Sequence, residues 1–86
     1  MAENVEEVIK RAEAIGRVLA EPLFVEVVEE TRQAIIREWE GSLNVNQRET
    51  AHATLKGLAK LMEKLKAVVS SGEHVRAEMT RPRRPA

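Results

Sequence analysis

The sequence predicts an all-α protein: a helical hairpin with a kinked N-terminal helical arm, or alternatively a small three-helix bundle. Three observations point to this class. Apolar residues recur at steps of three and four along most of the 86 residues, which is the spacing of one face of a helix. Pro22 and Gly41 interrupt the pattern. The segment after Gly41 carries a heptad-like apolar series.

The first predicted helix lies between Val5 and Leu19. Its spacing matches one stripe of a helix, made by Val5, Val8, Ile9, Ala12, Ile15 and Leu19. At Glu21-Pro22 we expect a break or sharp kink, because proline cannot donate to the preceding turn but suits the first position of a new helix.

The second predicted helix follows Pro22 and ends at Gly41. Its helical spacing is made by Leu23, Phe24, Val27, Val28, Thr31, Ala34, Ile35 and Trp39. Glycine just beyond the last periodic residue is typical of a left-handed helix stop. The polar residues 42–46 then form a short connection.

The third predicted helix runs from Gln47 to Ser71, opened by a capping box of Asn46 and Glu49. Its apolar residues step by four and three, as a and d positions of a heptad do. They are Ala51, Leu55, Leu58, Met62, Leu65 and Val69. Gly72 is expected to end this helix.

Two regions are predicted: a single helical domain over 1–72 and a C-terminal basic Pro/Arg tail over 73–86. Residues 73–80 can form two marginal helical turns that need a surface to dock on, with Val75 and Met79 as their apolar contacts. Residues 81–86 are basic and contain two prolines, a composition that stays extended unless bound.

The residue inventory argues against an enzyme and against metal or cofactor sites. Cysteine is absent, and the only histidines, His52 and His74, have no second ligand type at the helical spacing that a zinc site favours. No glycine-rich loop follows a strand. We therefore predict a non-enzymatic protein with no cofactor and no metal.

No apolar run approaches the roughly 20 residues of a membrane span, and the N-terminus is acidic where a secretory signal is basic. We expect no membrane partner and a cytoplasmic location, which for a phage-encoded protein means the host cytoplasm or the virion.

Charge is divided unevenly along a chain of formal net charge zero. Residues 1–40 hold ten acids and five bases, whereas residues 41–86 hold four acids and nine bases. Such halves can attract within one chain or between copies.

A basic ridge on the third helix and the tail form a candidate contact for an anion or nucleic acid. Its members are Arg48, Lys56, Lys60, Lys64, Arg81, Arg83 and Arg84. The favoured interpretation places the ridge beside the glutamates of the second helix, because the net charge is zero and no aromatic residues are interleaved with it. A small nucleic-acid-binding protein is the alternative function.

The apolar faces predict a protein–protein interaction or assembly module, a homo-oligomer or part of a larger protein assembly. The expected interface residues are Phe24, Val28, Ile35, Trp39, Leu55, Leu58, Met62 and Leu65. Two questions stay open at this stage. The heptad seam can pack within the chain or on another copy, and the Trp39 ring can clamp the loop or stand at an intersubunit contact.

Residues 19–72 carry short features that resemble small phage and prophage proteins encoded among virion structural genes. These features are the apolar first helix, Glu38-Trp39 before a polar gap, Arg48-Glu49 opening a long amphipathic helix, and the ending at 69–72. The resemblance implies a virion-associated or assembly role, such as a minor capsid, connector, cement or scaffold component. It also implies that Arg48 and Glu49 cap and orient the long helix.

Small helical-hairpin oligomers are also similar to phage sponges that sequester cyclic nucleotide signals of bacterial immunity. Those proteins have polar and aromatic pocket residues at subunit junctions. This chain has no tyrosine and offers only Arg48, Thr50 and the lysines, so the sponge is the third alternative.

Overall fold

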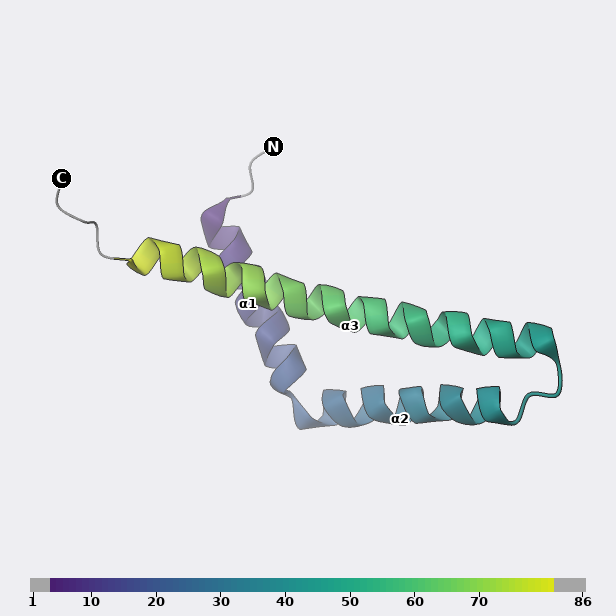
Figure 1. The fold of residues 1–86 in the computed structure, drawn as a ribbon. Helices are drawn as coiled ribbons and strands as arrows, with labels where there is room; N and C mark the ends of the chain where they lie inside the picture. Colours follow the sequence, from purple (N-terminus) through teal and green to yellow (C-terminus); the bar gives the residue numbers. More distant parts are fainter. Residues whose placement is uncertain (1–3, 82–86) are drawn as a thin grey trace.

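The computed structural model describes residues 4–81 and shows three helices in that range, with no strand. They are α1 (Val5–Ala20), α2 (Pro22–Glu40) and α3 (Val45–Thr80). The predicted all-α class is confirmed (Figure 1).

The break between α1 and α2 lies at the predicted position. Asn4 caps α1, because its side-chain oxygen accepts a hydrogen bond from the Glu6 amide at 2.8 Å. Glu21 has extended dihedral angles, φ −73° and ψ 117°, between the two helices. Pro22 is the first residue of α2, where its missing amide costs no helical hydrogen bond.

α2 ends before Gly41 as predicted, but not by a left-handed glycine. Gly41 has φ −82° and ψ −4°, which is right-handed, so that part of the prediction is wrong. The end of the helix is instead satisfied by Ser42, whose buried hydroxyl donates to the Glu38 carbonyl at 2.6 Å. A side chain takes over one of the carbonyls that the last turn leaves free.

α3 begins two residues earlier than the sequence suggests. The side-chain oxygen of Asn44 accepts from the amides of Asn46 at 2.7 Å and Gln47 at 3.3 Å. The predicted capping box of Asn46 and Glu49 is therefore wrong, since Asn46 already lies in the first turn of the helix. Two asparagines two residues apart offered the same local signal.

α3 also continues past the predicted stop. It passes through Gly72 without a break and ends at Thr80, so the predicted helix end at Gly72 is wrong. The two turns after Gly72 belong to one helix of 36 residues, about 54 Å long. Residues 82–86, most of the predicted extended tail, lie outside the described residues.

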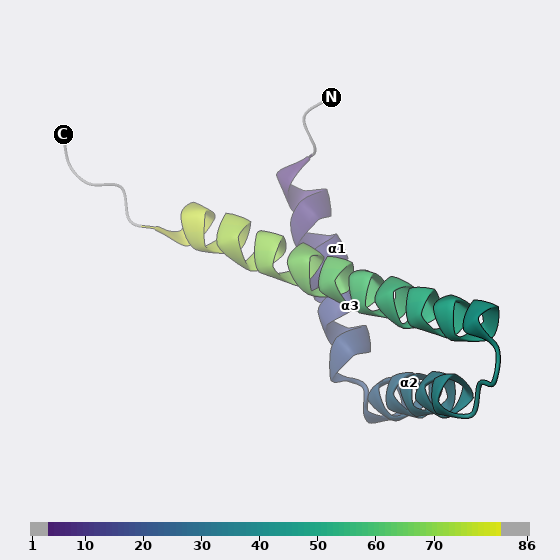
Figure 2. The ribbon, with the colours of Figure 1, turned by 45° about the vertical axis from the view of Figure 1, so that its right-hand side comes forward.

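α2 and α3 form an antiparallel hairpin, and α1 crosses α3 near its C-terminal end (Figures 1 and 2). Gly72 is buried at this crossing, next to Ala12 of α1. A glycine at this point lets the two helix backbones approach closely. Tertiary packing thus gives Gly72 a role that overrides its tendency to end a helix.

The fold has little interior. Among residues 4–81 no large side chain is fully buried, and the buried residues are Ala12, Ser42, Ala51 and Gly72. The radius of gyration is 18.7 Å, against about 12 Å for a compact chain of this length. The chain exposes 7324 Å², against about 5,100 Å² for a compact monomer of 9.7 kDa.

Candidate interaction surface

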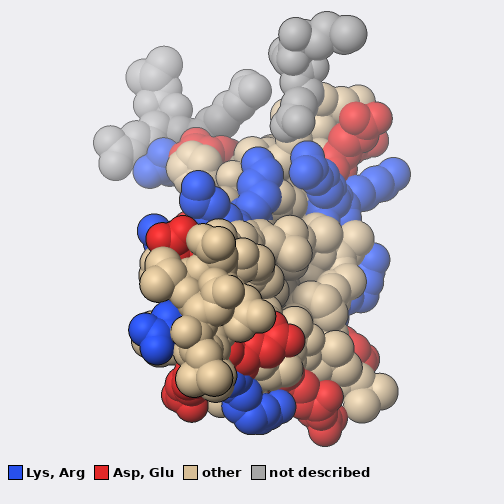
Figure 3. Space-filling view, turned by 90° about the vertical axis from the view of Figure 1, so that its right-hand side faces the viewer, with Lys and Arg blue, Asp and Glu red and all other residues tan. Residues whose placement is uncertain are grey.

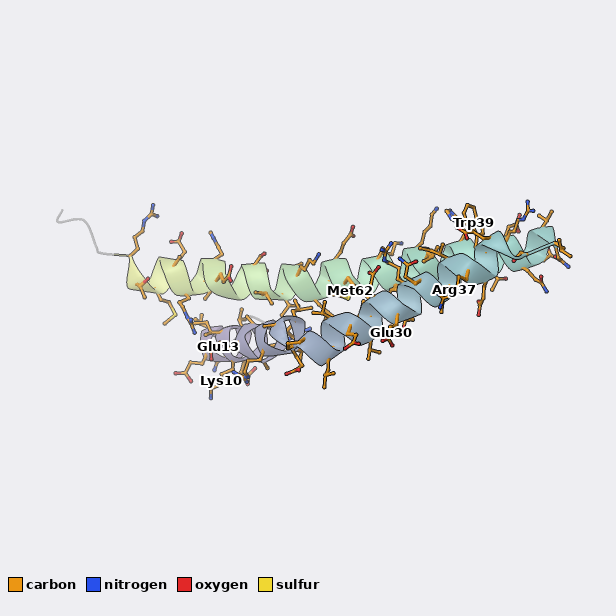
Figure 4. The ribbon with its side chains drawn as sticks, turned by 90° about the horizontal axis from the view of Figure 1, so that it is seen from below. Lys10, Glu13, Glu30, Arg37, Trp39 and Met62 are labelled. Atoms are coloured by element: carbon orange, nitrogen blue, oxygen red, sulfur yellow. The ribbon has the colours of Figure 1, made fainter. Side chains whose placement is uncertain are left out.

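The heptad seam of α3 packs within the chain. Val28 of α2 and the three α3 residues Leu55, Leu58 and Met62 line the same hollow between the two helices. Met62 points from α3 toward α2 (Figure 4). Of the eight predicted interface residues, seven are only half-buried in this seam or its continuation: Phe24, Val28, Ile35, Leu55, Leu58, Met62 and Leu65.

Trp39, the eighth predicted interface residue, lies near the tip of the hairpin. Its exposed fraction is 44%, and it lies on the side of the hairpin away from α1 (Figure 4). More than half of Trp39 is therefore covered by the chain itself, and the rest is open to solvent or to a partner.

The two broad faces of the hairpin can be told apart by the hollows that line them. Glu38 and Thr54 line one hollow, whereas Arg32 and Lys66 line another on the opposite face. Residues seven apart lie on the same side of a helix. Leu61 and Val68 therefore continue the side of Thr54.

α1 stands on the same face as Leu61 and Val68. Val68 and Lys64 of α3 share a hollow with Val8 and Arg11 of α1. Val18, seven residues after Arg11, lies on the side of α1 that borders this face. We call the side of the hairpin that carries Leu61 and Val68 the α1-side face. The surface of α2 and α3 on this side is its floor, and α1, which crosses one end of the floor, is its wall.

Exposed apolar side chains are concentrated on the α1-side face. Leu23 and Val27, four residues apart on α2, are 67% and 56% exposed, and Leu61 on α3 is 55% exposed. Val27 shares the side of Glu38, which follows it by three helical turns. Val18 on the wall is 41% exposed. Leu23 and Val27 belong to the apolar series predicted for the second helix, but spacing gave no sign that they would stay exposed while Phe24 and Val28 are half-buried.

The opposite face carries both apolar and charged side chains, and Trp39 lies on it as well (Figure 4). Val25, seven residues before Arg32 and thus on its side of α2, is 52% exposed. Around it lie Glu29 and Arg32, which form an ion pair at 2.7 Å. Glu63 and Lys66 of α3 line the same face, so an apolar partner would meet charges there.

The hairpin tip adds two further exposed apolar residues, Leu43 at 99% and Val45 at 67%. Figure 3 looks onto the tip and shows uncharged residues in the middle of the surface, with charged residues mostly around them. Arg48 steadies the loop, because its Nε donates to the Ser42 carbonyl at 3.2 Å. The resemblance implied that Arg48 caps α3, but the cap is Asn44.

The predicted basic ridge is only partly assembled. Lys56, Lys60 and Lys64 are exposed on α3, and none of them forms an ion pair within residues 4–81. The sequence predicted that the ridge lies beside the glutamates of α2, and no ion pair joins the two groups within residues 4–81. Arg48 bonds to the loop instead, and Arg81 pairs with Glu78 at 3.8 Å. Two predicted members, Arg83 and Arg84, lie outside the described residues.

The glutamates of α2 differ in their surroundings: Glu38 lines a hollow together with Thr50 and Thr54 of α3. Glu30 lies on the outer side of α2 together with Arg37 (Figure 4). Glu29 accepts hydrogen bonds from Arg32 and Gln33 at 2.7 to 3.0 Å. The bonds from Arg32 and then Gln33 lower the pKa of Glu29 from 4.5 to about 2. The same pair raises the pKa of Arg32.

The joint between α1 and α3 has two parts. Gly72 lies against Ala12, and a side chain at position 72 would also come within 3.5 Å of the Val8 carbonyl. One helical turn further on, Arg76 forms an ion pair with Glu13 of α1. The sequence signal for this joint was the heptad series itself, which continues from Val69 to positions 72 and 76.

Neither a metal cluster nor a membrane span is found in the described part of the chain. Residues 4–81 contain no group of three or more histidine, aspartate or glutamate residues that could hold a metal ion. Within the same range, no helix combines the length and the apolar character that crossing a bilayer requires. Comparisons of the chain with protein families, with curated proteins and with solved structures found no match.

Proposed function

We propose that the chain is a non-enzymatic self-assembly module whose exposed apolar faces are covered by further copies of itself. The observation that carries the proposal is the thin interior. No large side chain is fully buried among residues 4–81, although 43% of the chain is hydrophobic. Burial of apolar surface is the main favourable term in folding, and a second copy would supply what the single chain lacks.

The size of the exposed surface supports the same proposal. The chain exposes roughly 2,200 Å² more than a compact monomer of its mass would. A standard protein–protein interface covers about 800 Å² on each partner. The excess is therefore large enough for one full interface per chain.

A phage virion-associated or assembly component, which the resemblance in the sequence implies, would be one use of such a module. The virion assignment stays a prediction, and the test is whether the protein co-purifies with particles of a phage that encodes it.

The mass in solution tests self-assembly directly. We expect light scattering on the purified full chain to give a defined multiple of 9.7 kDa at both low and high salt, because apolar burial is not screened by ions. Absorbance should show that the sample is free of nucleic acid. A monomer at all accessible concentrations would refute the proposal.

A nucleic-acid-binding role is the second candidate, supported by the three exposed lysines of α3 that have no ion partner within residues 4–81. Binding through Lys56, Lys60 and Lys64 would weaken steeply with salt, because contacts to phosphates release counterions. The variant Lys60→Glu/Lys64→Glu should then lose affinity and flatten the salt dependence. Absence of binding at low salt would remove this candidate.

A further inference from the structure

The α1-side face has the shape of a step. The hairpin forms its floor, α1 stands at one end near Gly72, and the tip with Leu43 lies at the other end (Figures 1 and 2). About 40 Å of α3 separates Gly72 from Val45. A partner on this floor must therefore be long and narrow, and it must stop at the wall.

Exposed apolar side chains run along the whole step. Val18 borders the wall, Leu23, Val27 and Leu61 lie on the floor, and Leu43 projects from the tip, all between 41% and 99% exposed. A single partner that covered the floor from end to end would cover all five.

We infer that this partner is a second copy of the chain turned end for end, so that the tip of each hairpin meets α1 of the other. The inference rests on the proposed self-assembly and names its surface and its orientation. The hairpin is itself the long narrow body that the floor requires. Leu43 at the tip of the second hairpin would give Val18 on the wall an apolar contact that it does not have within its own chain.

The wall decides between the two orientations. A second hairpin laid in the same direction would bring its own α1 into the space that the first α1 already occupies. A hairpin turned end for end places each α1 beyond the tip of the other copy. The resulting interface is isologous: Val18 of the first copy meets Leu43 of the second, and Leu43 of the first copy meets Val18 of the second.

Charge permits this pairing. The formal net charge is zero, so two copies are not driven apart by overall repulsion. Both faces carry charged side chains: Glu38 and Lys64 line hollows on the α1-side face, and Arg32 and Lys66 line a hollow on the opposite face. What distinguishes the α1-side face is its number of exposed apolar side chains, which are Val18, Leu23, Val27 and Leu61, against Val25 and Trp39 on the opposite face.

Two valines of α2 make a matched test of the face. Val27 lies on the α1-side face and Val25 on the opposite one, and their exposed fractions are 56% and 52%. We expect Val27→Lys to reduce the mass of the full-length protein to that of a monomer at concentrations where the wild type is an oligomer. Val25→Lys should keep the wild-type mass. Lysine has a higher helix propensity than valine, so neither change weakens α2 as a helix.

The outcomes separate this inference from the proposed function. A wild-type protein that is a monomer refutes the self-assembly itself, and the inference with it. If the wild type is an oligomer and Val25→Lys dissociates while Val27→Lys does not, self-assembly stands and the α1-side face is wrong. Circular dichroism on each variant shows whether its helices persist, and the following test does not depend on the lysine variants.

A cross-link tests the orientation in an undisturbed interface. The chain has no cysteine, so Val18→Cys/Leu43→Cys introduces its only two thiols. They lie beyond opposite ends of α2, about 28 Å long, so a short bismaleimide can join them only between two chains. We expect a covalent dimer with the double variant and little with either single variant. Efficient cross-linking of the single variants, or none with the double variant, would overturn the end-for-end arrangement.

Discussion

Gly72 shows how one residue controls the joint between α1 and α3. A methyl group at position 72 would overlap the Cβ of Ala12, so α1 would have to move away from α3. We expect Gly72→Ala to lower the free energy of unfolding by about 1 kcal/mol, because overpacking costs more than the helix propensity that alanine adds. Urea unfolding followed by circular dichroism measures this.

Gly57 provides the control for that experiment. It lies in the same helix, and nothing would come within 4 Å of an added Cβ. Gly57→Ala should therefore raise the free energy of unfolding by about 0.5–1 kcal/mol. Equal effects of the two substitutions would show that the crossing at Gly72 is not close.

Glu29 carries the clearest pH dependence on the surface of α2. Its folded pKa of about 2 lies below its ordinary value of 4.5, so the contribution of its pairing to stability is present above pH 4.5. That contribution is lost as the pH falls through about 2. We expect Arg32→Ala to raise the pKa of Glu29 toward 4.5, measured by NMR titration of its side-chain carboxyl carbon. An unchanged pKa would mean that Arg32 is not its main partner.

At the scale of the element, the start of α3 depends on Asn44. Its side-chain oxygen accepts from two amides of the first turn, so Asn44→Ala should cost about 1 kcal/mol of stability. Asn46, which sequence reasoning chose as the cap, should tolerate the same change with a smaller effect. Thermal unfolding of the two variants decides between them, and a larger loss for Asn46→Ala would restore the original assignment.

The helices themselves were predictable, and their ends were less so. The Glu21-Pro22 break follows from the covalent structure of proline, and it lies at the expected position. The predicted start of α3 was misplaced because Asn44 and Asn46 carry the same capping signal. Its predicted end was wrong because Gly72 packs against Ala12 of α1. Only the contacts of each residue in the folded chain decide which signal is used.

For the whole molecule, the thin interior predicts a stability that depends on protein concentration. If a second copy covers the α1-side face, unfolding and dissociation are linked, and the melting temperature rises with concentration. For a dimer of this size we expect about 4 °C for each tenfold increase. Val27→Lys should abolish this dependence while Val25→Lys keeps it. A melting temperature independent of concentration in the wild type would contradict the linkage.

The candidate surface was predicted only in part. The seam residues Leu55, Leu58 and Met62 follow from heptad spacing, and they do pack against another helix, although that helix belongs to the same chain. Val27 and Leu61 were visible as apolar positions, but spacing alone gave no reason to prefer their side of the hairpin. Only the position of α1 in the folded chain shows that Val27 and Leu61 share the face that α1 bounds.

Periodicity, proline chemistry and composition determined by themselves that this chain forms amphipathic helices, that α1 and α2 separate at Pro22, and that no disulfide supports the fold. These are local or compositional properties. The tertiary structure alone decided that Gly72 continues α3 and that the seam is used within the chain. It also decided which apolar side chains remain exposed. Each of these depends on contacts between residues far apart in sequence, which spacing along one helix does not encode.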